Sequence, residues 1–297
     1  MIRNVVVLIS KTIRTVGNVF CRLSLLLDRV SGSSQLENNC NKVRITKKEG
    51  NMVVCKNNEY LWKLDESQYI DSEILKYGVF ERDSTKLSKE LIKPGMVVAD
   101  VGANFGYYTV IFSKLVGEDG FVHAFEPSCR FRGRLLEHLK MNNCHNVSVS
   151  EFGLSDRNES LTLFGGGDSA TLHWVGRDCP VVEENIIVMT LDDYVEENEI
   201  DRIDFIKVDI DGHEPKFIDG AIKTIERFRP IILMEFMQLA LLKAGSNVEL
   251  LKKKLEDLGY VMQSEHDNKP FMSHTEFLIE SMNCAYSVNI VCFPMGL

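Results

Sequence analysis

The stretch Val97-Val-Ala-Asp-Val-Gly-Ala-Asn-Phe-Gly-Tyr-Tyr-Thr-Val-Ile-Phe112 decides how this chain folds. Residues 96–101 are a short apolar run, and an apolar run of this length predicts a buried strand. A turn with two glycines follows, and then apolar residues recur at helical spacing over residues 107–115. A strand, a glycine turn and a helix in this order are typical of the first unit of a parallel α/β sheet.

The same alternation continues towards the C-terminus. Further strands are predicted at residues 120–125, 147–152, 205–210, 231–236, 260–263 and 287–293, and further helices at 130–141, 215–228 and 247–258. The stretch between the strands at 147–152 and 205–210 is predicted to be irregular. We therefore predict an α/β protein with a Rossmann-like, mostly parallel seven-stranded sheet and helices on both faces. Ligands of such sheets bind beyond the carboxyl ends of the strands, so the residues that follow each strand are the candidates for function.

Three segments are predicted along the chain. Residues 1–30 form a basic amphipathic helix, residues 31–94 form a linker, a hairpin and a helical N-terminal extension, and residues 95–297 form the α/β domain. The basic residues of the first segment are Arg3, Lys11, Arg14, Arg22 and Arg29. Such a helix could lie on an anionic membrane surface or bind a partner, and the alternative is that it packs against the α/β domain or a second subunit in self-association.

Composition narrows the choice of partner and compartment. The formal net charge of −9 argues against a broad nucleic-acid-binding surface, so no nucleic-acid partner is expected. The eight cysteines form no CxxC pair and no regular framework, which suits a reducing compartment. We therefore predict a cytoplasmic protein.

The glycine turn predicts a ligand that carries both charges. Gly102 and Gly106 allow a sharp turn, and the helix that follows presents unpaired N–H groups to an anion. Asp100 offers the opposite charge, so the methionine end of S-adenosylmethionine, with its ammonium and carboxylate, matches the pair. A dinucleotide fits poorly, because Asn104 and Tyr107 occupy positions where its fingerprint requires glycine.

Two later strand ends extend the predicted cofactor site. Glu126 lies 20 residues after Gly106, the usual spacing for an acid that accepts hydrogen bonds from ribose hydroxyls. The third strand leads into Gly153, Leu154 and Ser155, which are expected to border an adenine ring.

Several motifs in the same order resemble the FkbM family of S-adenosylmethionine-dependent methyltransferases. They are Tyr77-Gly-Val-Phe-Glu81, Pro94-Gly95, Asp100-Val-Gly-Ala-Asn-Phe-Gly-Tyr-Tyr-Thr109, Phe125-Glu-Pro127, Gly153-Leu-Ser-Asp156, Thr190-Leu-Asp-Asp-Tyr194 and Asp204-Phe-Ile-Lys-Val-Asp-Ile-Asp-Gly-His-Glu214. The resemblance implies the class I methyltransferase fold for residues 95–297 and S-adenosylmethionine as cofactor, with Asn104, Tyr108 and Thr109 inside the cofactor motif. It also implies methyl transfer, often to a sugar hydroxyl or another oxygen of a glycan or natural product. Asp211 departs from the pattern, since the family more often has glutamate there.

The predicted catalytic groups follow the strand at residues 205–210. Lys207 and Asp209 share one face of that strand, and His213 and Glu214 come directly after it. A base there would help a hydroxyl to attack, so Asp209 is expected to face the acceptor, with His213 or Glu214 as the base. The alternative is that Lys207 and Asp209 only hold each other.

Acceptor binding is assigned to Asp211, Trp174 and Glu235. Asp209, Asp211 and Glu235 could also hold magnesium, but the spacing does not require a metal and none is predicted. The expected acceptor is a small molecule, a glycan or a peptide, and methylation of a peptide or natural-product nitrogen is the alternative. A non-catalytic relative that binds a partner is the remaining hypothesis.

Overall fold

The computed structural model describes residues 43–57, 60–166, 169–172, 182–265 and 287–296. The helix predicted at residues 1–30 and the predicted acceptor residue Trp174 lie outside these residues. In the described part of the chain, no helix combines the length and the apolar character needed to cross a bilayer.

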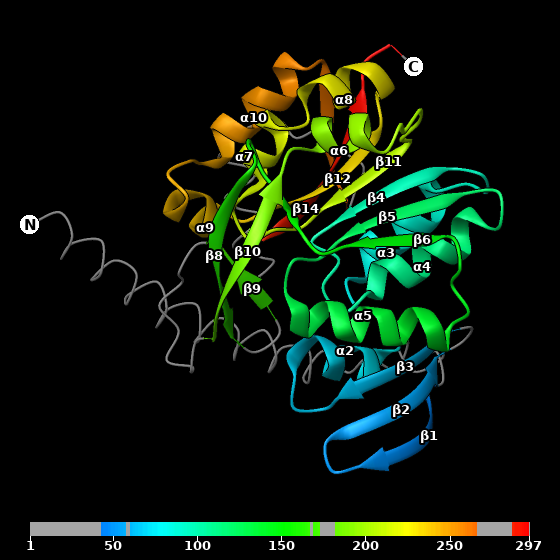
Figure 1. Ribbon diagram of the computed structural model, residues 1–297. Coiled ribbons are helices and arrows are strands. Elements are labelled where there is room, and N and C mark those ends of the chain that lie inside the picture. Colours follow the sequence, from blue (N-terminus) through cyan, green and yellow to red (C-terminus); the bar gives the residue numbers. More distant parts are fainter. Residues whose placement is uncertain (1–42, 58–59, 167–168, 173–181, 266–286, 297) are drawn as a thin grey trace, which may run out of the picture.

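A seven-stranded sheet forms the centre of the molecule (Figure 1). Its order is β13 (Tyr260–Ser264), β14 (Val288–Pro294), β12 (Ile231–Phe236), β11 (Phe205–Val208), β4 (Val97–Val101), β5 (Phe121–Phe125) and β6 (Val147–Ser150). Strand β14 runs antiparallel to both of its neighbours, and the other pairs are parallel. The mostly parallel seven-stranded sheet predicted from the sequence is confirmed.

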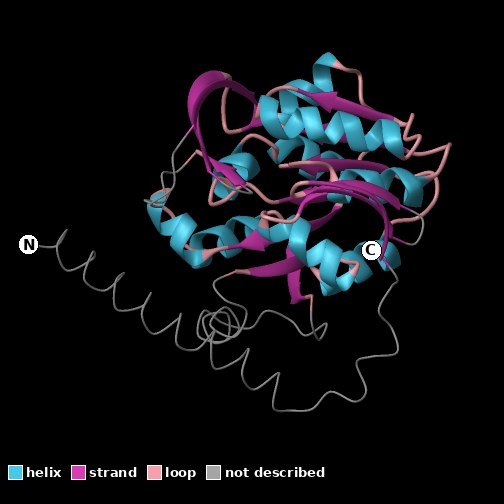
Figure 2. Cartoon of the chain, turned by 90° about the horizontal axis from the view of Figure 1, so that it is seen from below, coloured by secondary structure: helices cyan, strands magenta, loops and turns pink. Residues whose placement is uncertain are grey.

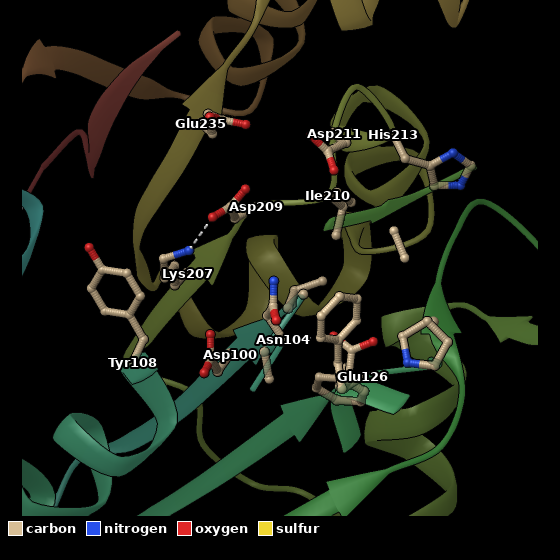
Figure 3. A pocket seen from close by; sticks show the side chains of 18 of the residues that line it. Asp100, Asn104, Tyr108, Glu126, Lys207, Asp209, Ile210, Asp211, His213 and Glu235 are labelled. Carbon is tan, nitrogen blue, oxygen red and sulfur yellow. Dashed lines mark hydrogen bonds and ion pairs between the residues drawn. The ribbon is translucent and has the colours of Figure 1, made fainter. Parts of the chain in front are cut away.

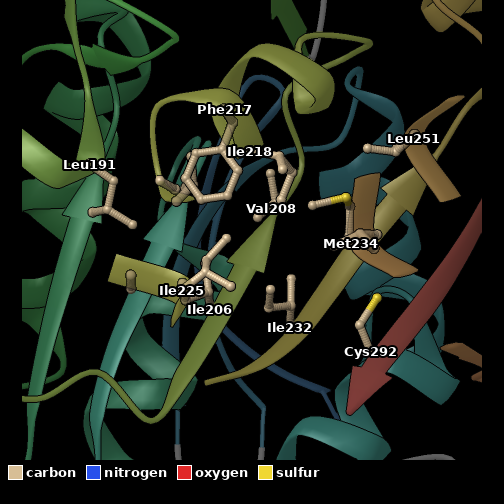
Figure 4. Close-up of a cluster of buried hydrophobic side chains, with 14 of the residues drawn as sticks. Leu191, Ile206, Val208, Phe217, Ile218, Ile225, Ile232, Met234, Leu251 and Cys292 are labelled. Atoms are coloured by element: carbon tan, nitrogen blue, oxygen red, sulfur yellow. The ribbon is translucent and has the colours of Figure 1, made fainter. Parts of the chain in front are cut away.

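Helices cover both faces of this sheet (Figure 2). One face packs against α6 (Leu191–Glu197), α7 (Glu214–Asp219), α8 (Ile222–Phe228) and α10 (Val248–Asp257). The other face packs against α3 (Arg82–Leu91), α4 (Tyr107–Val116) and α5 (Cys129–Met141). Because side chains alternate along a strand, Ile206 and Val208 enter the first core, drawn in Figure 4, and Phe205 enters the second. Lys207 has the same orientation as Phe205, towards α4.

The stretch between β6 and β11 contains a second sheet where the sequence predicted an irregular segment. Its order is β7 (Gly153–Leu154), β10 (Val182–Met189), β8 (Glu159–Gly166) and β9 (Ser169–Thr171). Leu163, Ile186 and Val188 form a small core of its own. The helix predicted at residues 215–228 is also wrong as one unit. It divides into α7 and α8 around Gly220, whose Cα lies so close to the Ser155 carbonyl that a Cβ would be 1.9 Å from that oxygen.

The N-terminal extension packs into the same core as the large sheet. The predicted pairing of β1 (Val43–Glu49) with β2 (Met52–Asn57) is present, and β3 (Tyr60–Asp65) adds a third antiparallel strand. Trp62 is fully buried and its ring stacks on Tyr107 of α4, with centroids 5.5 Å apart. Two helices follow, α2 (Tyr69–Tyr77) and α3, and α9 (Gln238–Lys243) is a further short helix after β12. The domain boundary predicted at residue 95 stays a prediction.

Gly102 joins β4 to β11 by a close approach of the two backbones. A Cβ on Gly102 would lie 2.0 Å from the carbonyl oxygen of Asp209, and its φ of +83° also disfavours a side chain.

We expect Gly102→Ala to lower the free energy of unfolding by about 1–3 kcal/mol more than the matched variant Gly95→Ala. Gly95 has a similar φ of +81° with nothing within 4 Å, so it reports backbone strain alone. Urea unfolding of the two variants measures the difference, and equal losses would contradict the clash.

Candidate functional site

A cavity of about 740 Å³ lies at the carboxyl ends of β4, β5, β11 and β12. This volume is within the range of about 300–1,000 Å³ that is typical for ligand pockets. Among the residues predicted to bind the cofactor, the cavity wall includes Asp100, Gly102, Asn104, Tyr108, Glu126, Gly153 and Leu154. Among the other predicted site residues, it includes Lys207, Asp209, Asp211, His213 and Glu235. Figure 3 shows how most of these side chains converge on the same space.

One end of the cavity, called here the glycine-loop end, is built from the turn after β4. Asn104 adopts a left-handed backbone conformation with a φ of +50°, and its N–H donates to Glu126 Oε2 at 2.7 Å. The other oxygen of Glu126, Oε1, accepts from the Ser128 N–H at 2.9 Å. The carboxylate of Glu126 thus ties the end of β5 to the glycine loop. Burial raises the pKa of Glu126 to about 7, although both N–H groups favour its charged form.

Asp100 is buried beside this loop and is only half satisfied. Thr109 Oγ1 donates to Asp100 Oδ2 at 2.6 Å, whereas Oδ1 has no hydrogen-bond partner among the described residues. Burial raises the pKa of Asp100, and the nearby Lys207 ammonium opposes that rise. An unpaired buried carboxylate oxygen costs free energy, so this atom is suited to a donor from a ligand.

The second sheet supplies an apolar wall to the glycine-loop end. Leu154 of β7, Leu163 of β8 and Ile186 and Val188 of β10 all line the cavity. The sequence indicated Leu154 but none of the other three, because their strands come from the segment predicted to be irregular.

Three residues predicted to bind the cofactor do not line the cavity. Gly106 instead packs against α5, where a Cβ would lie 2.4 Å from Leu135 Cδ1. Thr109 is fully buried beneath Asp100, and Ser155 is fully buried with its hydroxyl 2.9 Å from His213 Nε2. These three residues were predicted to contact the cofactor directly. In the structure they lie behind the cavity wall and support the residues that form it.

The other end, called here the carboxylate end, is organised by the register of the parallel strands. Lys207 of β11 lies opposite Asp100 of β4, which places the two side chains next to each other. Lys207 Nζ donates to Asp209 Oδ2 at 2.8 Å and lies 4.5 Å from the centre of the Tyr108 ring. Burial alone would lower the pKa of Lys207, but the carboxylates of Asp209, Glu81 and Asp100 raise it above its ordinary value. Lys207 and Asp209 do hold each other, and both also face the cavity.

Glu214 is placed away from the cavity and holds the turn after β11. Its Oε1 accepts from the N–H groups of Ile210 and Gly212, both at 3.2 Å, and the side chain is buried. Burial raises its pKa to about 8. His213 does reach the cavity wall, but its ring points away from Asp209 and is 2% exposed (Figure 3). Glu214, one of the two residues predicted as the base, is therefore not part of the cavity wall.

Glu235 and Asp211 face the carboxylate end from neighbouring elements. Glu235, near the end of β12, is 9% exposed, and Asp211 has a left-handed φ of +50°. Burial raises the pKa of Glu235 well above its ordinary value, and the charges of Asp209, Asp211 and Glu81 raise it further. Across the described residues, no three His, Cys, Asp or Glu side chains are grouped as metal ligands.

The cavity also contains a residue that the sequence reasoning did not select. Glu81 precedes α3, and its Oε2 accepts from the Tyr108 hydroxyl at 2.7 Å. Burial raises its pKa to about 7, while Lys207 opposes that rise. The motif Tyr77-Gly-Val-Phe-Glu81 was already part of the resemblance, so its glutamate could have been chosen as a candidate.

A family model described as the methyltransferase FkbM domain matches residues 100–262 of the chain. This match covers more than half of the sequence and includes most residues of the cavity wall. The chain belongs to the FkbM methyltransferase family. The chain has the class I methyltransferase fold that the sequence predicted. S-adenosylmethionine is the cofactor of the family.

The individual proteins that resemble this chain are distant from it in sequence. A probable cobalt-precorrin-6B C(15)-methyltransferase (decarboxylating) of Thermoplasma acidophilum is 33% identical over 96 residues, which are 29% of this chain and 45% of that protein. The FkbM methyltransferase structure from Methylobacillus flagellatus KT matches with a TM-score of 0.42 and 16% identity, over 70% of this chain and 50% of that one. A SAM-dependent methyltransferase from Aquifex aeolicus matches with a TM-score of 0.41 and 17% identity, over 75% of this chain and 93% of that one. A putative rRNA-methylase from Clostridium thermocellum matches with a TM-score of 0.45 and 15% identity, over 71% and 93% of the two chains.

The raised pKa of Glu235 predicts a pH-dependent stability in this FkbM methyltransferase. Because the folded pKa lies above the unfolded value of about 4.3, the wild type loses stability as the pH rises from there towards the folded pKa. Glu235→Gln keeps the shape and removes the titration. Its stability relative to the wild type should therefore increase as the pH rises above about 4.3, by up to about 1.4 kcal/mol per pH unit.

Urea unfolding at several pH values measures this difference. The control is Glu197→Gln, at an exposed glutamate of α6. A difference in stability between Glu235→Gln and the wild type that does not change with pH would refute the assignment.

Proposed function

We propose that this protein transfers a methyl group from S-adenosylmethionine to a hydroxyl oxygen of a sugar or another natural product. The observation that carries the proposal is that one cavity contains both the glycine-loop end and the strand-end residues Asp209 and Lys207. Membership of the FkbM family supports methyl transfer, and the choice of oxygen as acceptor rests on the sequence resemblance.

The glycine-loop end fits the cofactor in its charges and its shape. Asp100 has a buried carboxylate oxygen without a donor, so it would accept from the ammonium of the methionine part. Glu126 would accept from the ribose hydroxyls, since each of its oxygens has one N–H partner and a further lone pair. Leu154 with Leu163 and Val188 would cover the adenine ring.

Asp209 is the group best placed to take the proton of the acceptor hydroxyl. Lys207 holds its Oδ2, while no hydrogen bond from the described residues reaches Oδ1, and 31% of the side chain is exposed. When bound, the cofactor supplies an electrophilic methyl group on a sulfonium, so the protein has to orient the hydroxyl and accept its proton. His213 is less suitable as the base, because its Nε2 is engaged by the Ser155 hydroxyl.

The charge of the carboxylate end supports a small acceptor rather than a nucleic acid. Glu81, Asp211 and Glu235 would repel phosphate groups, which nucleic-acid binding must neutralise. The absence of a nucleic-acid partner and a cytoplasmic location remain predictions from the sequence, as does the role of residues 1–30 at a membrane or in self-association.

Binding of S-adenosylhomocysteine tests the cofactor site. We expect the wild type to bind in the micromolar range and Glu126→Gln to bind at least tenfold more weakly, because an amide cannot accept at both oxygen positions. Isothermal titration calorimetry measures both affinities, and thermal unfolding verifies that the variant is folded. The matched control is Glu151→Gln, a glutamate near β6 whose side chain is 81% exposed, and it should bind like the wild type. Absence of binding by the folded wild type would refute the proposed cofactor site.

Transfer of labelled methyl groups tests the base. With [methyl-¹³C]S-adenosylmethionine and a cell extract as the source of acceptor, we expect Asp209→Asn to reduce the rate of labelling by about 10²–10⁴-fold. Its affinity for S-adenosylhomocysteine should stay within about twofold of the wild type, and the exposed control Asp201→Asn should keep the full rate. Unchanged labelling by Asp209→Asn would exclude Asp209 as the base.

The labelled product also decides the acceptor class. The ¹³C chemical shift distinguishes a methyl group on oxygen from one on nitrogen, which is the alternative reaction. Product that disappears on ribonuclease treatment would overturn the prediction that no nucleic acid is involved.

A further inference from the structure

The carboxylate end of the cavity carries much more negative than positive charge. Its acidic side chains are Glu81, Asp209, Asp211, Glu235 and Glu265, and Lys207 is the sole lysine or arginine among the described residues of the cavity wall. An excess of this size is costly in a partly enclosed space, where charges interact more strongly than in water. The excess therefore indicates that a positively charged group belongs there.

Three donors among the described residues are engaged by other carboxylates of the cavity wall. Lys207 is ion-paired with Asp209 at 2.8 Å, the Tyr108 hydroxyl donates to Glu81 at 2.7 Å, and the Ser84 hydroxyl donates to Glu265. These contacts fix three of the five acidic groups in place.

Glu235 differs from these groups because no described residue donates to it. It is more than nine-tenths buried and lines the cavity, yet no hydrogen bond or ion pair from the described residues reaches its carboxylate. In Figure 3 its side chain lies on the same side of the sheet as Asp209, beyond the Lys207–Asp209 pair. A buried carboxyl group without a partner normally costs stability, so its presence in the cavity wall points to a ligand that supplies the donor.

We propose that Glu235, together with Glu81 and Asp211, binds a primary ammonium group of the acceptor, so that the acceptor is an amino sugar or a similar aminated polyol. The inference rests on the proposed function and specifies its substrate class. An ammonium has three donors and no acceptor, which suits a site of several carboxylates that lacks metal-ligand geometry. The charged N–H groups would form charge-assisted hydrogen bonds in a buried site. The hydroxyl that is methylated then lies on the same molecule, within reach of Asp209.

Binding of amino sugars to the complex with S-adenosylhomocysteine tests the inference. Glucosamine and galactosamine are titrated into the saturated complex by calorimetry, with glucose and galactose as their uncharged counterparts. We expect at least one amino sugar to bind at least tenfold more tightly than its counterpart. Glu235→Gln should remove at least tenfold of that affinity and leave S-adenosylhomocysteine binding unchanged, and the exposed control Glu151→Gln should change neither.

Proton release gives a second readout that a structural role for Glu235 would not change. Because burial and the surrounding carboxylates raise the pKa of Glu235, an incoming cation should lower that pKa and expel a proton. Titrations in two buffers of different ionisation enthalpy count the protons, and Glu235→Gln should release fewer than the wild type. Glu81→Gln provides an independent variant and should also weaken the amino sugar.

Each outcome separates this inference from the proposed function. Tight S-adenosylhomocysteine binding with no preference for either amino sugar would overturn the ammonium site and leave the methyltransferase proposal intact. Amino-sugar binding that Glu235→Gln leaves unchanged would also overturn it. Failure of S-adenosylhomocysteine to bind, with amino sugars still bound by the free protein through Glu235, would support the ammonium site and count against the cofactor site.

Discussion

The close approach of Gly102 to the carbonyl of Asp209 is the constraint on which the site depends. Two backbones can come this near only because Gly102 has no Cβ, and the contact joins the end of β4 to the end of β11. The N–H of Asp209 also donates to Val101 O at 3.0 Å, so the hydrogen bonding between the two segments continues beyond β11 to Asp209 in the cavity wall. The glycine loop and the acidic turn are therefore positioned by the same contact. A change at either backbone would move both ends of the cavity relative to each other.

The carboxyl groups that line the cavity are buried or partly buried and therefore lose much of their hydration. For Glu126, hydrogen bonds from two backbone N–H groups replace part of the lost hydration, and for Asp209 the ion pair with Lys207 does so. Glu235 has neither arrangement, and its burial, together with the charges of Asp209, Asp211 and Glu81, raises its pKa well above its ordinary value. Buried groups with shifted pKa values and incomplete partners are typical of binding and catalytic sites, because the missing partner is supplied by the ligand. The distribution of satisfied and unsatisfied carboxyl groups distinguishes the structural acids of this cavity from those available to a substrate.

The N-terminal extension takes part in the site as well as in the core. Trp62 packs on Tyr107, and the next residue of α4, Tyr108, holds Glu81 in the cavity wall. Glu81 thus comes from outside the segment matched by the family model, yet it faces Lys207 within it. The second sheet, whose strands lie between β6 and β11 in the sequence, contributes the apolar wall of the glycine-loop end through Leu163 and Val188. The two ends of the cavity are therefore completed by segments that precede and interrupt the regular alternation of strands and helices.

The sequence by itself determined the sheet, the glycine loop and most of the cavity residues, because these follow from local patterns. Apolar runs and helical periodicity depend on near neighbours in the chain, and residues that end parallel strands meet at one edge whatever their separation. Those rules were enough to select Asp100, Asn104, Glu126 and Asp209. Only the tertiary structure decided which side chains beyond those strand ends face the cavity. Glu214 turns back to cap its own loop, Ser155 supports His213 from beneath, and Glu81 and the second sheet enter from segments distant in sequence. The physical reason is that side-chain direction after a strand is set by long-range packing and hydrogen bonding, which no local pattern of residues encodes.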